Sequence, residues 1–272
     1  MLELISFEFF QRALILAITM GISASLLSPY LVLNQQAMIA DGLAHVSFTG
    51  IILGIILADV PFYIAIPYVM LASLLIKYLA TTKTMNGDAA IAIVSSVSFA
   101  IGLILVKVSP GFNISIESML VGNMFTSTPA ELILSIVILA IIATFILMNY
   151  RALFLITYDE DYATFLRIPV RALSYIIAIL TAFFIVVGVR AIGTLLISAL
   201  IIFPSLIASQ WTKSFRNTLL FGVMASLAVV IMGIFTAHFL AIPAGSTIVV
   251  IYAILLIASL VYRKINESVV KT

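Results

Sequence analysis

The chain has 272 residues and a formal net charge of +2, and 64% of its residues are hydrophobic while only 9% are charged. A water-soluble domain has about 25% charged residues, so this composition, with a mean hydropathy of +1.31, excludes a soluble globular protein and predicts an integral membrane protein. The absence of cysteine excludes disulfides and thiolate metal sites.

Nine apolar segments follow one another along the chain, and a membrane-spanning helix needs roughly 20 such residues. They cover residues 9–33, 43–58, 62–80, 89–108, 131–149, 172–190, 192–210, 218–240 and 245–262. Because a backbone in lipid must satisfy its own hydrogen bonds, uniformly apolar segments of this length predict helices rather than the alternating strands of a membrane barrel. We therefore predict an all-α bundle of eight or nine transmembrane helices in one membrane domain, 1–272. The lower number applies if the first segment is interfacial or the second does not cross.

Basic residues gather in alternate connections, which sets the orientation because cytoplasmic loops carry an excess of Lys and Arg. The basic positions are Lys83, Arg151, Arg167, Arg171, Lys213, Arg216, Arg263, Lys264 and Lys271. This alternation predicts nine crossings with the C-terminus in the cytoplasm and the N-terminus outside. It also places the one long polar connection, 150–171, on the cytoplasmic side.

The segment MIADGLAHVSFTGIILG, residues 38–54, places a carboxylate and an imidazole at the start of the second apolar run. Asp41 and His45 are four residues apart, so both lie on one face of a helix, where they can share a divalent cation. Thr49 continues that face, and ionisable groups at membrane depth commonly line a pathway or pair with a partner. Two ligands make an incomplete zinc site, so other helices, a second chain or water would supply the rest. The alternative is a boundary pair in which Asp41 caps the helix and His45 bonds to a neighbour.

Three further features have two interpretations each. His238 is either a ligand or entry group for a cation, or an interfacial ring with its polar edge in water. Pro204 interrupts a predicted span, where it either breaks the helix beside a cavity or only kinks it. The acidic run Asp159, Glu160 and Asp161 is either a docking site for a partner or a solvated loop.

Four stretches of the sequence resemble the permease subunit of the metal-ion ABC importers, a family that takes up zinc, manganese or iron. They are MIADGLAHVSFTGIILG, ITYDEDYATFLRIPVRAL, IGTLLISALIIFPSLIAS and IPAGSTIVVIYAILL, and their order and spacing hold over essentially all 272 residues. Overall the chain is most similar to the zinc-uptake members. The resemblance implies a permease domain in a bacterial cytoplasmic membrane, importing a divalent metal ion that is favoured to be zinc.

The resemblance also implies partners and residue roles. Two permease copies would form the pathway, two cytoplasmic ATPase subunits would supply ATP hydrolysis, and an extracytoplasmic metal-binding protein would deliver the ion. The chain itself would be neither an enzyme nor a nucleic-acid-binding protein, and would hold no permanent cofactor. Asp41 and His45 would contact the ion, with Thr49, Pro204 and His238 as further pathway residues. A short cytoplasmic helix within Asp159–Arg171 would sit in a groove of the ATPase, through Asp159, Glu160, Asp161, Ala163 and Arg167.

The chain departs from the family pattern in two places. Relatives often have glycine where this chain has Arg167, and some carry an acidic residue before the last Pro-x-Gly, where this chain has Ala241 and Ile242. Two other classes of protein are weaker alternatives. A secondary metal transporter needs several carboxylates inside the membrane, whereas Asp59, Asp88, Glu117 and Glu131 fall in connections or at span ends. An intramembrane metalloprotease needs the motif H-E-x-x-H, and ATP binding by the chain itself needs G-x-x-x-x-G-K-[ST]. The sequence contains neither motif.

Overall fold

The computed structural model describes residues 7–58, 60–82, 85–109, 122 and 124–270, and the side chains among them up to Ile265. Nine helices in this part of the chain are long and apolar enough to cross a membrane, which is the higher of the two predicted numbers. They are α2 Glu8–Val32, α3 Ile39–Ala58, α4 Pro61–Thr81, α5 Gly87–Val108, α7 Pro129–Tyr158, α9 Val170–Ile192, α10 Thr194–Trp211, α11 Phe215–Leu240 and α12 Ala244–Val270. Two short helices, η1 Met124–Thr126 and α8 Glu160–Phe165, complete the described elements, which include no strand.

The prediction for the long polar connection was wrong in its first part. The sequence predicts a loop over 150–171, but α7 continues through Tyr158 and only then ends. Residues 150–158, YRALFLITY, contain few helix breakers and remain largely apolar, so they extend the preceding helix. The chain turns at Asp159, whose carboxylate accepts a hydrogen bond from the Tyr162 backbone at 2.9 Å and so caps α8.

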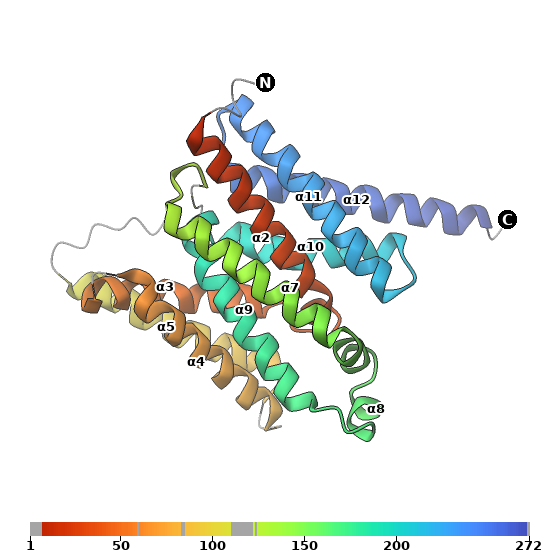
Figure 1. Cartoon of the computed structure of the whole chain (residues 1–272), viewed down its shortest axis with the longest axis horizontal. Coiled ribbons are helices and arrows are strands. Elements are labelled where there is room, and N and C mark those ends of the chain that lie inside the picture. Colours follow the sequence, from red (N-terminus) through yellow and green to blue (C-terminus); the bar gives the residue numbers. More distant parts are fainter. Residues whose placement is uncertain (1–6, 59, 83–84, 110–121, 123, 271–272) are drawn as a thin grey trace.

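Helix α2 lies at the centre of one half of the bundle, in contact with α7, α10 and α11 (Figure 1). Hydroxyl side chains connect it to each of these helices. Ser28 donates to Ser205 of α10 at 2.8 Å, and Ser226 of α11 donates to the Gly21 carbonyl at 3.0 Å. Apolar burial cannot drive association in lipid, so small residues and such hydrogen bonds hold helices together.

Helix α3 packs between α4 and α5 in the other half, and α9 contacts both halves. Two glycines allow the close approach of α3 and α4, because Gly50 lies against the backbone of Ala65 and Gly54 lies against that of Pro61. Both glycines therefore serve helix packing. Helix α3 also contacts α9 and α10, and among these neighbours one face of its first turns stays open.

Most of the basic residues lie at one end of the bundle, where α4, α7, α10 and α12 end and α5, α9 and α11 begin. Figure 1 shows α8 at this same end, beside the end of α7. The described basic residues there include Arg167, Arg171, Lys213, Arg216 and Lys264, while Lys83 and Lys271 lie outside the described residues. We call this end the cytoplasmic end, following the excess of positive charge. At the opposite end, Arg12 pairs with Glu8 and Arg190 pairs with Glu131.

Candidate functional site

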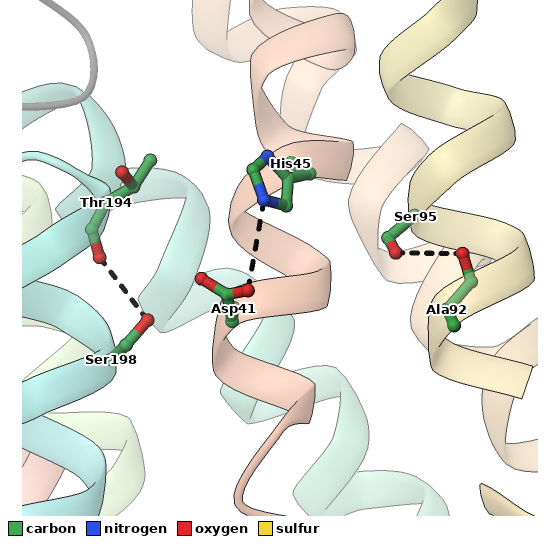
Figure 2. Close-up of polar contacts among 6 residues, drawn as sticks. All are labelled: Asp41, His45, Ala92, Ser95, Thr194 and Ser198. Carbon is green, nitrogen blue, oxygen red and sulfur yellow. Dashed lines mark hydrogen bonds and ion pairs between the residues drawn. The ribbon is translucent and has the colours of Figure 1, made fainter. Parts of the chain in front are cut away.

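The first turns of α3 place Asp41 and His45 on one face, as the sequence predicts. Asp41 is the third residue of the helix, inside the first turn rather than at the N-cap, so its carboxylate lies in the favourable field of the helix N-terminus. His45 follows one turn later, with Nε2 3.9 Å from Asp41 Oδ2 (Figure 2). This separation is too long for a hydrogen bond. A shared cation with bonds of about 2.1 Å needs the two atoms roughly 3–3.5 Å apart, which a small side-chain rotation provides.

Asp41 and His45 are exposed within an otherwise buried segment. Their side chains are 55% and 36% exposed, whereas the other residues from Ile39 to Ile52 are buried. The neighbouring Gly42 lies against Ile91 and Ser95, four and eight residues after the start of α5. At a rise of about 1.5 Å per residue, Gly42 therefore lies roughly 6–12 Å inside the span of α5, and the pair beside it lies at a similar depth. The open face of α3 is thus polar at membrane depth.

Helix α5 fixes the orientation of the imidazole. The His45 ring packs against Phe99 with 5.0 Å between ring centroids, and Phe99 packs in turn against Phe48 at 5.1 Å. Thr49, expected to continue the polar face, is instead fully buried and donates a hydrogen bond of 2.6 Å to the Ser98 carbonyl of α5. The structure thus places Thr49 in the α3–α5 contact, apart from the open face.

Helix α10 borders the open face on the other side. Figure 2 shows Thr194 and Ser198 of α10 beside Asp41, and α3 and α10 are in contact. The chain enters α10 through Gly193, whose φ of 85° and ψ of 162° form a conformation that essentially only glycine adopts. This glycine turns the chain from α9 into α10 and so positions the first turn of α10 near the Asp41 carboxylate.

The other two expected pathway residues lie elsewhere. Pro204 is buried inside a continuous α10 and packs against Gly222 of α11. His238 lies near the outer end of α11, where its ring packs against Phe10 and Phe125 at centroid distances of 5.6 and 6.4 Å. Among the described residues, no group of three or more His, Cys, Asp or Glu could hold a metal ion. Asp41 and His45 are therefore the two candidate ligands that this chain brings together.

The acidic run forms the short cytoplasmic helix that the family resemblance implies, α8. Asp159 caps its start, Glu160 and Asp161 are exposed in its first turn, and Ala163 is fully buried. Arg167 follows the helix with a φ of 59°. The backbone N–H of Arg167 donates to Thr164 at 2.9 Å and that of the next residue donates to Ala163 at 3.1 Å, which is a Schellman motif.

An ion pair between a buried carboxylate and a partly exposed arginine at the outer end was not anticipated. Glu131 is 4% exposed; its Oε2 accepts from the Thr128 backbone at 2.8 Å and its Oε1 contacts Arg190 Nε at 3.0 Å. The Arg190 guanidinium also lies over the Phe62 ring, 5.2 Å from its centroid. These contacts join the outer ends of α4, α7 and α9. The residues are far apart in sequence, so no local spacing could have indicated them.

Comparisons with known proteins define the class of this fold. It is similar to a solved structure described as "PsaBC from Streptococcus pneumoniae in complex with Fab", with a TM-score of 0.83 and 27% identity over 94% of this chain and 92% of that one. A Haemophilus influenzae protein named "Probable iron transport system membrane protein" is 32% identical over 98% of both chains. "Manganese import system permease protein ScaB" of Streptococcus gordonii is 28% identical over 93% of this chain and 91% of its own. The class is that of ABC transporter permeases.

A profile of the ABC 3 transport family matches residues 6–263. The chain belongs to the ABC 3 transport family. It is a multi-pass permease of the bacterial cytoplasmic membrane, as the resemblance of its four sequence stretches implied.

Proposed function

We propose that the chain is the permease subunit of an ATP-driven importer of a divalent transition-metal ion, either manganese or ferrous iron. The observation that supports this function most is the Asp41–His45 pair, which is exposed at membrane depth with its two ligand atoms 3.9 Å apart. Iron and manganese are the metals in the names of the two relatives. Zinc, which the sequence resemblance favours, is the alternative, and neither relative is named for it.

The exposure of Asp41 supports a second copy of the chain across the pathway. A charged side chain that faces lipid near the centre of a helix costs about 2.5–3.5 kcal/mol, so such groups face a partner or a water-filled cavity. A two-fold related copy would cover this face and bring a second Asp41 and a second His45. Two copies would then supply four ligands, where one chain supplies two.

The ligand chemistry fits a transported ion better than a structural one. Carboxylate oxygen suits manganese and imidazole suits iron and zinc, so a mixed set discriminates weakly among them. A transport site must also release its ion, which favours few ligands and an open face. Discrimination would then come partly from the extracytoplasmic metal-binding protein that delivers the ion.

Two features favour an ABC importer over a secondary transporter. The buried carboxylate among the described side chains is Glu131, and Arg190 already neutralises it. Asp59 and Glu117 lie outside the described residues. The short capped helix α8 at the cytoplasmic end also provides an element for docking a separate ATPase subunit, and we infer that ATP hydrolysis takes place in that subunit.

The test is uptake of radioactive manganese, ferrous iron and zinc into proteoliposomes that contain the chain, its ATPase and its binding protein. Asp41→Asn and His45→Gln should each lower uptake by about tenfold or more, because each removes one of few ligands. Asp88→Asn and His238→Gln are matched controls and should retain uptake. Uptake at the wild-type level in both ligand variants would remove the Asp41–His45 pair from the pathway, and uptake without the ATPase would exclude the ABC mechanism.

A further inference from the structure

A polar cavity opens at the cytoplasmic end, between the ends of α2 and α4 and the start of α9. It consists of a small inner part of about 120 Å³ and an outer part of about 690 Å³. The two parts share the lining residues Gln36, Lys77, Glu160 and Ser174. We call the two parts together the α4–α9 cavity. Neither part is lined by Asp41 or His45.

The lining of the cavity is predominantly positive. Lys77 reaches both parts from α4, and Arg171 lines the outer part from the first turn of α9. Glu160, at the start of α8, is the one carboxylate in the lining. The first turn of α9 adds the positive end of a 23-residue helix. Two cations and a helix N-terminus against one carboxylate favour an anionic ligand.

A buried hydroxyl in the inner part has no partner. Tyr30 is 1% exposed and lines the inner part, and its Oη makes no hydrogen bond with any of the described residues. The ring is fixed against Phe215, with 5.4 Å between centroids. A buried hydroxyl without a hydrogen-bond partner is energetically unfavourable, so this group indicates a bound polar ligand that extends into the inner part.

We propose that the α4–α9 cavity binds the phosphate of a phospholipid headgroup from the cytoplasmic leaflet. Lys77 and Arg171 contact the phosphate oxygens, Tyr30 bonds to the deepest polar atom of the headgroup, and Glu160 faces its hydroxyl or ammonium group. Basic pockets between transmembrane helices on the cytoplasmic side are suited to headgroups. Apolar exposed surface on α4 leads away from the rim, through Tyr78 at 57% and Leu71 at 65%, and would carry the acyl chains.

The bound lipid would connect two functional elements. Helix α4 packs along α3, which carries Asp41 and His45, and Glu160 belongs to α8. A headgroup held between Lys77 and Glu160 therefore links the α3–α4 pair to the cytoplasmic helix. This proposal depends on the cavity alone and holds whichever metal the protein transports.

The first experiment measures the lipid that remains bound to the full-length chain, by native mass spectrometry after delipidation in mild detergent. Wild type should retain one phospholipid per chain. Lys77→Gln should retain about tenfold less, which corresponds to the loss of one charge-assisted hydrogen bond. Tyr30→Phe, which removes only the hydroxyl, should retain several-fold less. Lys213→Gln, which removes an exposed lysine from the same end, should match wild type.

A thermal-shift titration identifies the source of the phosphate. A short-chain phosphatidylglycerol should raise the melting temperature of wild type and Lys213→Gln but not that of Lys77→Gln. A shift with inorganic phosphate and none with the short-chain lipid would retain the phosphate site and identify free phosphate as its ligand, which would overturn the lipid assignment. Equal retention and equal shifts in wild type and Lys77→Gln would overturn the whole proposal.

Discussion

Arg167 ends helix α8 in a left-handed backbone conformation, with a φ of 59°. This conformation costs an L-residue roughly 1–2 kcal/mol, and glycine avoids that cost. Arg167→Gly should therefore stabilise the turn by about 1 kcal/mol and raise the melting temperature of the purified chain. Thr164→Gly, inside α8, is the opposite control and should destabilise by about 1 kcal/mol. A lower melting temperature for both variants would mean that contacts of the Arg167 side chain stabilise the protein by more than its left-handed backbone conformation costs.

Gly193 is the residue on which the start of α10 depends. Its φ of 85° and ψ of 162° lie in a region that costs other residues about 1–3 kcal/mol. Gly193→Ala should lower the melting temperature, and uptake should fall because Thr194 and Ser198 shift relative to Asp41. Gly87→Ala is the control, because nothing lies closer than 4.0 Å to the added methyl group there. An unchanged melting temperature in Gly193→Ala would show that the junction rearranges without strain.

At the scale of residues, the sequence predicts what depends on local spacing. Asp41 and His45 share a face because four residues make about one helical turn. Phe99, which orients His45, and the Tyr30 and Lys77 lining of the cavity come from helices far apart in sequence. No spacing rule connects such residues, so they required the tertiary structure. Thr49 shows what spacing cannot predict. It lies on the predicted face one turn beyond His45, but α5 packs over it.

At the scale of elements, hydropathy predicts all nine spans because each must fill the membrane with apolar residues. Hydropathy cannot predict where a helix ends outside the membrane. There, water can form hydrogen bonds with the backbone of a loop, so a helix and a loop are both possible. Helix α7 therefore continues to Tyr158, beyond the predicted end at 149. The start of α7, in contrast, has a local sequence signal. Thr128 and Glu131 form a capping box that determines where the helix begins.

The outer ends of three helices depend on one ion pair. Arg190→Gln leaves the buried Glu131 carboxylate without its partner, so we expect a loss of about 2 kcal/mol in stability. Thermal unfolding of the purified chain measures this loss. Arg12→Gln breaks the exposed pair with Glu8 and should change stability by less than about 1 kcal/mol. Similar losses in the two variants would argue against a special role for the pair that contains the buried Glu131.

At the scale of the whole molecule, the two halves of the bundle leave one polar face uncovered. Helix α2 is packed against three long helices, α7, α10 and α11. Helix α3, in contrast, leaves Asp41 and His45 exposed at membrane depth. Contact of these ionisable groups with lipid is energetically unfavourable. The fold is therefore complete in its apolar packing but incomplete in its polar contacts, which is the condition expected of a subunit whose pathway forms between copies.

The uncovered face can be tested by crosslinking, because the chain contains no cysteine. A single Ser198→Cys variant places a thiol on α10 beside Asp41, so a short bis-maleimide should link two copies in the membrane. Met224→Cys, on a part of α11 that is 69% exposed, is the control and should give monomers. Denaturing gels measure the covalent dimer in both variants. A dimer from Met224→Cys alone would place the interface on α11, and Asp41 would then need a different neighbour to replace lipid.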